Sequence, residues 1–142
     1  MKTVAQLLEV KPSGVISVGP DLPVIDALRV LADRDVGAVL VMDGSRLVGI
    51  FSERDYTRKV ALKGKSSSGT PVGEIMTREV VVVTPAHSNE ECMALMTGKR
   101  VRHLPVVDKD RVVGVLSIGD LVKDAISEQQ FTIDQLQSYI YR

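Results

Sequence analysis

The sequence contains one cysteine and no tryptophan, and aromatic residues occupy only 4% of its positions. A lone cysteine, Cys92, cannot form a disulfide within the chain, which fits a reducing compartment, and we expect the protein to be cytoplasmic. Aromatic side chains are too few to build a stacking platform for single-stranded nucleic acid. Net charge is also lacking, because 18 Lys and Arg residues balance 18 Asp and Glu residues. The composition therefore gives no electrostatic reason to expect a nucleic acid or an anionic membrane as a partner.

Long apolar runs are absent as well. The longest are too short to span a bilayer, and the amphipathic residues 1–9 do not have the form of a signal peptide, so we expect no membrane partner. Hydrophobic residues nevertheless make up 44% of the 142 residues. This is enough to bury a core in one compact domain or in two very small units.

Residues for catalysis and metal binding are scarce. Two histidines and one cysteine provide little for a nucleophile with an oriented base, and no Walker loop, nucleophile elbow or Gly-x-Gly-x-x-Gly motif is present. The sequence has no cluster of Cys and His residues for zinc. We expect no enzymatic activity, no metal and no catalytic cofactor.

The sequence does contain an internal repeat. Residues 15–60 align without a gap with residues 80–125, at a constant offset of 65 residues, and 11 of the 46 aligned pairs are identical. Composition alone would give about three identical pairs. A weaker similarity relates residues 4–8 to residues 72–76. We therefore expect two copies of one structural unit.

Each copy has the same order of predicted elements. A β-branched run (residues 15–18 and 80–83) is ended by a proline and followed by a helix. Asp21 is the expected cap of the first of these helices, and Ser88 with Glu91 forms a capping-box pattern before the second. Two strands around a tight turn (residues 38–42 and 47–51, then 103–107 and 112–116) precede another helix. The strands are nearly all apolar, which indicates a sheet covered on both faces, so the predicted fold class is α/β (α+β) with two β-α-β-β-α repeats.

These patterns divide the chain into a first repeat (residues 1–62), a flexible linker (63–71), a second repeat (72–125) and a C-terminal helical extension (126–142). In the extension, Thr132 and Gln135 are placed to cap a last helix that carries Ile133, Leu136 and Ile140 on one face. Covering the protein's own core is the favoured role of this face. A dimer contact is the alternative.

The residues that end the third strand of each copy are the main functional candidates. Both copies read Gly-x-x-Ser-x-x-Asp, from Gly49 to Asp55 and from Gly114 to Asp120. The pattern places a hydroxyl and a carboxylate where a strand ends and a helix begins, a common place for ligands of α/β folds, and free helix N–H groups there suit a phosphate. A carboxylate can accept hydrogen bonds from both hydroxyls of a ribose. The same residues also match a capping box, and the residues alone leave both interpretations open.

Two β-α-β-β-α copies, each with this motif after a hairpin, resemble a tandem pair of cystathionine-β-synthase (CBS) domains. Residues 101–108, Val-Arg-His-Leu-Pro-Val-Val-Asp, are also similar to a segment of that family. The resemblance covers about residues 3–125. It implies two repeats packed with pseudo-twofold symmetry in a regulatory module of the Bateman type, which binds an adenine nucleotide in clefts between the repeats and forms a homodimer.

The resemblance also implies which residues contact the nucleotide. Asp55 and Asp120 would hold ribose hydroxyls, and the serine of each motif would lie near the phosphates. Ile16 and Val81, from the first strand of each copy, would form apolar walls for the adenine. The full implied set is Ile16, Gly37, Ala38, Ser52, Arg54, Asp55, Val81, Arg102, His103, Pro105, Ser117, Gly119 and Asp120.

The two copies differ in basic residues. Arg102 and His103 of the second copy have no basic counterparts in the first, where Arg54 is the added charge. Pseudo-twofold packing would bring these three side chains towards a shared centre, where guanidinium groups match phosphate oxygens. AMP, ADP, ATP or NAD(H) is therefore the expected ligand, with one cleft binding more tightly than the other.

The implied function is to sense energy or redox state and to signal it to a separate protein partner, which the sequence does not name. S-adenosylmethionine is an alternative ligand, since it presents the same adenosine without phosphates. A ligand-free dimerisation scaffold is the alternative function.

Overall fold

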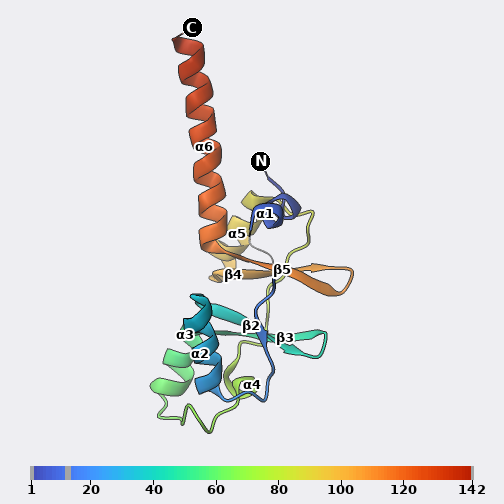
Figure 1. Ribbon diagram of the computed structural model, residues 1–142, viewed down its shortest axis with the longest axis vertical. Coiled ribbons are helices and arrows are strands. Elements are labelled where there is room, and N and C mark those ends of the chain that lie inside the picture. The colour runs from blue at the N-terminus through green and yellow to red at the C-terminus, as the bar shows by residue number, and fades with distance from the viewer. Residues whose placement is uncertain (1, 12–13, 142) are drawn as a thin grey trace. The chain divides into compact units, whose positions relative to one another are not determined.

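Figure 1 shows the computed structural model, which describes residues 2–11 and 14–141. The chain forms two compact units, each with its own hydrophobic core. The first-repeat unit contains residues 15–80. The second-repeat unit combines the residues up to 14 with those from 81 onwards.

The first-repeat unit is built on a three-stranded sheet with the order β1-β2-β3. Strand β1 (Ser17–Val18) pairs in parallel with β2 (Ala38–Asp43), and β2 pairs antiparallel with β3 (Arg46–Ser52). Helix α2 (Val24–Arg34) connects β1 to β2. Helix α3 (Glu53–Tyr56), a π-helical turn η1 (Thr57–Ala61) and α4 (Val72–Ile75) follow the hairpin. The predicted β-α-β-β-α order is confirmed in this unit.

The second-repeat unit contains a two-stranded antiparallel sheet of β4 (His103–Asp108) and β5 (Arg111–Ser117). Helix α1 (Val4–Val10) comes first in the chain, α5 (Asn89–Lys99) precedes β4, and α6 (Ile118–Ile140) follows β5. Serine and glutamate cap α5 as the sequence predicts, because Ser88 Oγ accepts from Glu91 N and Glu91 Oε1 accepts from Ser88 N. Both hairpins and the mixed helix and strand class are confirmed.

The predicted strand at residues 80–83 is wrong, because of these four residues only Val83 makes a β-bridge, in parallel with Val106. Pro105 supplies the physical reason. In the first-repeat unit Leu40 N donates to Ile16 O at 3.2 Å, and the aligned residue of the second copy is Pro105, which has no N–H to donate. Val83 still donates to Pro105 O and accepts from Val107 N, at 3.0 and 2.8 Å.

Continuous burial along the central strands confirms that both faces of each sheet are covered. Val39, Leu40 and Val41 of β2 are at most 2% exposed, and three consecutive residues of β4, Leu104, Pro105 and Val106, are buried. Such runs lack the polar alternation of a half-exposed strand. The lone cysteine belongs to the second core, and burial raises the pKa of the Cys92 thiol. Cys92 thus serves as a small buried hydrophobe.

The short helix at the start of each repeat packs into the core of the other repeat's unit. Val4 and Leu7 of α1 lie in the core of the second-repeat unit, although α1 belongs to the first repeat in sequence. Val72 and Ile75 of α4 lie in the core of the first-repeat unit. The compact units therefore divide the chain differently from the repeat boundaries at residues 1–62 and 72–125.

Two capping predictions are wrong. Asp21 does not cap α2, because Pro23 holds the N-cap position and no side chain bonds there. Thr132 and Gln135 do not begin a separate helix, because α6 runs without a break from Ile118 to Ile140, and Thr132 Oγ1 donates to Glu128 O inside it.

The C-terminal half of α6 does not cover the protein's own core. Every residue from 129 to 141 is exposed, including Ile133, Leu136 and Ile140. The favoured role of this face in the sequence analysis is therefore wrong. Within the part of the chain that the structure describes, no helix has the length and apolar character needed to cross a membrane.

A close approach explains the glycine of each Gly-x-x-Ser-x-x-Asp motif. A Cβ on Gly49 would lie 2.6 Å from Met76 Sδ and 2.9 Å from the backbone O of Thr77, whereas a Cβ on Gly114 would meet a Leu8 side chain at 2.7 Å.

We expect Gly49→Ala to lower the free energy of unfolding by about 2 kcal/mol, because the backbone must move. Gly114→Ala should cost less, because a side chain can rotate away. Urea unfolding of both variants measures this, and equal costs would contradict the explanation.

Candidate functional site

The serine and aspartate of both motifs form capping boxes, as one of the two interpretations of the sequence predicts. Ser52 N donates to Asp55 Oδ2 at 3.0 Å, and Asp55 N donates to Ser52 Oγ at 3.1 Å. Ser117 N and Asp120 Oδ2 are 2.8 Å apart, and Asp120 N donates to Ser117 Oγ at 3.2 Å. These bonds fix each carboxylate at the N-terminus of a helix, α3 or α6. A cap leaves other lone pairs of the carboxylate available, so it does not exclude a ligand.

Asp55 is almost closed off by its own unit. Its side chain is 9% exposed, and its Oδ1 accepts from Thr77 Oγ1 at 3.0 Å and lies 2.9 Å from Lys59 Nζ. Its Oδ2 accepts from both the backbone N and the Oγ of Ser52. Both oxygens are therefore engaged before any ligand arrives.

Asp120 is more accessible, with 30% of its side chain exposed. Lys11 Nζ donates to Asp120 Oδ2 at 2.7 Å and also to the backbone O of Val115. Burial alone would raise the pKa of Asp120, but the hydrogen bonds from Lys11 and Ser117 outweigh it and lower that pKa. The carboxylate is thus ionised at neutral pH, with one lysine as its cation.

The first residue of β2 and the first residue of β4 each pair with a motif serine. Ala38 pairs with Ser52 in the first-repeat unit, and His103 pairs with Ser117 in the second. The preceding residues bond to the helix start, since Glu53 N donates to Gly37 O at 3.1 Å. In the other unit, Ile118 N donates to the carbonyl oxygen of Arg102 at 2.9 Å. The structure therefore brings these predicted site residues to one end of each hairpin.

His103 is neutral at neutral pH. Burial lowers its pKa, and Lys11 and Arg102 lower it further, while Asp120 acts in the opposite direction. Lys11, Arg102 and Asp120 therefore all act on His103, and Lys11 also lowers the pKa of Asp120. A phosphate brought to this end of the hairpin would meet the cationic groups of Lys11 and Arg102.

The remaining predicted residues are divided between wall and surface positions. Ile16 and Val81 are partly buried against their cores, and Pro105 is buried in β4. Arg54 and Gly119 are exposed at the first turns of α3 and α6. Arg54 belongs to one unit and Arg102 and His103 to the other, so their convergence stays a prediction.

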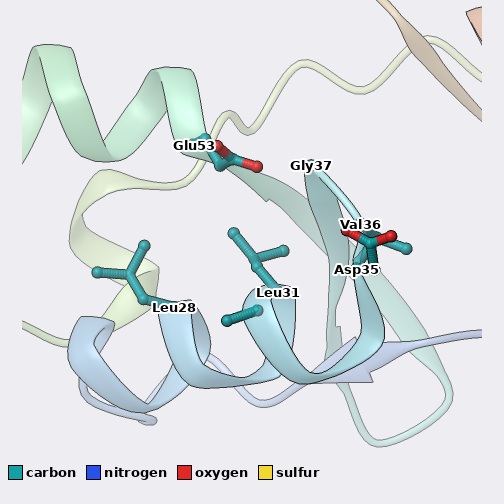
Figure 2. Close-up of a pocket in the computed structure, with 7 residues that line it drawn as sticks. Leu28, Leu31, Asp35, Val36, Gly37 and Glu53 are labelled. Carbon is teal, nitrogen blue, oxygen red and sulfur yellow. The ribbon is translucent and has the colours of Figure 1, made fainter.

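A hollow of about 400 Å³ lies in the first-repeat unit. Figure 2 shows its lining residues, between α2 and the start of α3. Leu28 and Leu31 form its apolar part, and Glu53 extends over it near Gly37. Gly37 is the one predicted site residue in its lining, and Asp35 and Glu53 make it acidic. Two carboxylates would repel a phosphate, so this hollow does not fit a phosphorylated ligand.

Three residues that contact the motif aspartates were not predicted: Lys11, Thr77 and Lys59. Lys59 lies four residues after Asp55, a spacing at which opposite charges meet on a helix, so the sequence contained a signal for it. Lys11 is 109 residues from Asp120, and no local pattern connects them. Among the described residues, no group of three or more His, Cys, Asp or Glu side chains could hold a metal ion.

Comparison with known sequences identifies the repeated unit. The sequence model of the CBS domain matches residues 9–62 and again residues 72–126. The chain belongs to the CBS domain family. It contains two CBS domains in tandem, as the resemblance implied.

The chain is 39% identical over 125 residues to the mitochondrial CBS domain-containing protein CBSX3 of Arabidopsis thaliana, covering 84% of this chain and 61% of that protein. It thus spans less than two thirds of that relative. A putative signal-transduction protein with CBS domains from Burkholderia ambifaria is 50% identical in its solved structure, with a TM-score of 0.88 over 93% of this chain and 99% of that one. The CBS domain pair of protein MJ0100, solved with 5′-methylthioadenosine and S-adenosylmethionine, shares the fold at 24% identity, with a TM-score of 0.78 over 90% of this chain and 98% of that one.

Proposed function

We propose that this CBS domain pair is a regulatory module that binds an adenine nucleotide at Asp120. The observation that carries the proposal is a partly exposed, ionised carboxylate at the N-terminus of a 23-residue helix, with a lysine as its counterion. Such a carboxylate can exchange its lysine for the two hydroxyls of a ribose. The dipole of the helix favours a nearby anion at this end, although the N–H groups of Ile118 and Asp120 are already bonded within the chain.

A phosphorylated ligand fits the charges around Asp120 better than a neutral one. Lys11 is hydrogen-bonded to the carboxylate, and Lys11 and Arg102 both act on the neighbouring His103. A phosphate would compensate Lys11 once the ribose had displaced it. AMP, ADP, ATP and NAD(H) all provide a ribose next to a phosphate. The MJ0100 pair was solved with adenosine derivatives that have no phosphate, so S-adenosylmethionine is the second candidate ligand.

The two motifs are proposed to bind unequally, with Asp120 as the tighter site. Asp55 is 9% exposed against 30% for Asp120, and Thr77, Lys59 and Ser52 already occupy its oxygens. A ribose that binds Asp55 must displace more hydrogen-bond partners than one at Asp120, and its two hydroxyls cannot replace all of the bonds that are lost. Titration that fits two identical sites would contradict this part of the proposal.

The proposed mechanism is regulatory and not catalytic. Binding would stabilise one arrangement of the chain, and a separate partner protein would respond to it, so that energy or redox state is signalled in the cytoplasm. A homodimer is the proposed assembly. A dimerisation scaffold without a ligand is the alternative function, and the two complete capping boxes favour it, because they give both motifs a structural role.

Thermal unfolding of ligand-free protein with AMP, ADP, ATP, NADH and S-adenosylmethionine tests the proposal. A ligand at about 100 times its dissociation constant should stabilise the wild type by about 2.7 kcal/mol. Asp120→Ala should remove most of this shift and Asp55→Ala much less. Asp120→Asn keeps an acceptor for the cap, and Asp108→Ala, at the opposite end of the β4–β5 hairpin, is the matched control that should keep the full shift.

No shift with any of the five ligands would contradict the proposal, once mass spectrometry shows the protein to be free of bound nucleotide. The capping boxes would then be the whole role of the motifs, and the scaffold function would stand. A shift that survives in Asp120→Ala would place the ligand elsewhere.

A further inference from the structure

The C-terminal half of α6 exposes a regular apolar stripe. Ile126, Ile133 and Ile140 recur every seven residues, and Leu136 follows Ile133 by three. The side chains of Ile126, Ile133 and Ile140 are 60%, 47% and 69% exposed, and Leu136 is 58% exposed. A surface helix normally turns such a face to a core. In Figure 1, α6 continues well past α1 and α5 of its own unit, which leaves this face uncovered by them.

The spacing of the stripe is that of a coiled coil. The isoleucines occupy the a positions of a heptad repeat, and Val122, Gln129 and Leu136 occupy the d positions. Two helices with the same seven-residue repeat can wind around each other so that their a and d residues stay in contact. Where isoleucine at a is combined with leucine at d, as at Ile133 and Leu136, the pair favours two parallel strands. We infer that α6 pairs with α6 of a second copy of this chain along this stripe.

Charge supports a second copy as the occupant. The e and g positions that flank Ile133 and Leu136 hold uncharged residues, so two identical helices meet there without like-charge repulsion. These residues are Gln130, Thr132, Gln137 and Tyr139. Residues 125–141 contain two acidic residues and no basic one. An anionic membrane surface attracts helices with Lys and Arg on the polar face, so the stripe does not fit that occupant.

Gln129 decides the direction of the pair. In a parallel dimer the two Gln129 side chains share one d layer and can hydrogen-bond to each other. In an antiparallel dimer, a positions pack against d positions, so the Gln129 amide would face an isoleucine and lose its hydrogen bonds on burial. A single polar residue in the seam therefore sets the register of parallel strands.

The sequence of the exposed half of α6 contributes little to the stability of the helix. Phe131, Thr132 and Ile133 are aromatic or β-branched and have low helix propensity. The contacts that support this half include bonds within the helix, Gln130 Nε2 to Asp134 Oδ1 at 2.8 Å and Thr132 Oγ1 to Glu128 O at 3.1 Å. The exposed half, residues 129–141, is a stretch whose length would be marginal for an isolated helix in water. Pairing with a second copy supplies the missing apolar burial.

Sedimentation equilibrium of the full chain without nucleotide tests the pairing. The wild type should be a dimer, and Ile133→Lys combined with Leu136→Lys should weaken the dimer by about 100-fold or more, because two buried seam layers per dimer would carry unpaired charges. Phe131→Lys is the matched control. Phe131 is 66% exposed but lies on the outer f position, so its loss should leave the dimer intact.

Disulfide trapping tests for contact between the two α6 helices even if another surface also holds the dimer together. Cys92→Ala removes the native thiol, which the first copy's aligned Ala27 shows to be a tolerable change, and Leu136→Cys places one thiol in the seam. Parallel pairing predicts a disulfide-linked dimer on mild oxidation, whereas Phe131→Cys in the same background should give none.

A wild type that stays monomeric, a seam variant that dimerises as tightly as Phe131→Lys, or a Leu136→Cys protein that does not cross-link would each overturn the inference. Another protein's helix would then be the occupant to seek. None of these results depends on nucleotide binding, so the pairing and the proposed function can fail separately.

Discussion

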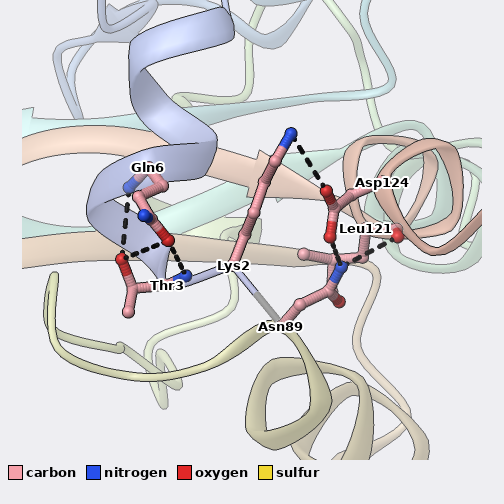
Figure 3. Close-up of polar contacts among 6 residues, drawn as sticks. All are labelled: Lys2, Thr3, Gln6, Asn89, Leu121 and Asp124. Carbon is pink, nitrogen blue, oxygen red and sulfur yellow. Dashed lines mark hydrogen bonds and ion pairs between the residues drawn. The ribbon is translucent and has the colours of Figure 1, made fainter. Parts of the chain in front are cut away.

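Replacing Asn89 with valine is expected to lower the free energy of unfolding by about 3 kcal/mol, the largest stability effect that the contacts in this chain suggest. Asn89 and Asp124 are 2% and 6% exposed. Asn89 Nδ2 donates to Asp124 Oδ2 at 2.6 Å and to the backbone O of Leu121 at 3.1 Å (Figure 3). Lys2 Nζ lies 3.3 Å from the other oxygen, Asp124 Oδ1, as an ion pair without aligned hydrogen-bond geometry. These contacts join the chain start, the first turn of α5 and the second turn of α6.

The cost arises from the partners that remain after the substitution. Valine leaves the Asp124 carboxylate buried with only the half-exposed Lys2 beside it, and an unsatisfied buried charge costs more than the hydrogen bond itself was worth. The Leu121 carbonyl loses a donor as well. Both losses loosen the base of α6.

The first repeat supplies the matched control for this experiment. Val24 aligns with Asn89 and is fully buried, so valine fits the corresponding helix start. Asn89→Val combined with Asp124→Leu should cost about 2 kcal/mol less than the sum of the two single variants, because no carboxylate remains to be stranded. Urea unfolding of the four proteins measures this. Additive costs would show that Asn89 and Asp124 contribute independently and would contradict the coupling.

Local patterns in the sequence were sufficient for three helix starts and for both hairpins. Ser52, Ser88 and Ser117 each precede a helix with an acidic residue three positions later, and all three form capping boxes. The capping bonds lie within four residues of chain, so the sequence alone contains the whole interaction. The unbroken α6 had a signal too, because no glycine or proline occurs between residues 120 and 142.

The remaining features depend on pairs of residues that are far apart in the chain. The missing strand at residues 80–83 follows from Pro105, more than 20 residues later, whose ring removes the N–H that would have extended the pairing. Helices α1 and α4 pack with the opposite repeat, a choice that their similar sequences cannot reveal. The same limit applies to the candidate site. Its aspartates were predicted from the motif, but Lys11 reaches Asp120 only through the packing of α1 into the second-repeat unit.

Replacing Lys11 with methionine is expected to change which adenosine ligands the module prefers. Lys11 occupies the carboxylate that a ribose would use, so removing it takes away a competitor. The ion pair is about one-third exposed on both sides, and such a pair contributes at most about 1 kcal/mol. Adenosine and S-adenosylmethionine should therefore bind about fivefold more tightly to Lys11→Met.

Phosphorylated ligands should respond in the opposite direction. In the proposed complex the displaced ammonium pairs with a phosphate, a charge-assisted contact whose loss costs about 1.5 kcal/mol or more. AMP gains the same fivefold from the loss of the competing lysine but loses this contact, so it should bind about twofold more weakly to Lys11→Met, and the ratio of the AMP and adenosine dissociation constants should rise by about tenfold. Isothermal titration of both ligands against wild type and variant measures the ratio directly. Lys109→Met, in the turn at the far end of the β4–β5 hairpin, makes the same change of charge and should leave the ratio unchanged.

A uniform change would have a different meaning. If both ligands weakened together, Lys11 would be supporting the shape of the site by holding Asp120 and the Val115 carbonyl, and the proposed exchange of partners would be wrong. If neither affinity changed, the nucleotide would not bind at Asp120. Opposite shifts for the two ligands are the result that only a lysine exchanging between carboxylate and phosphate produces.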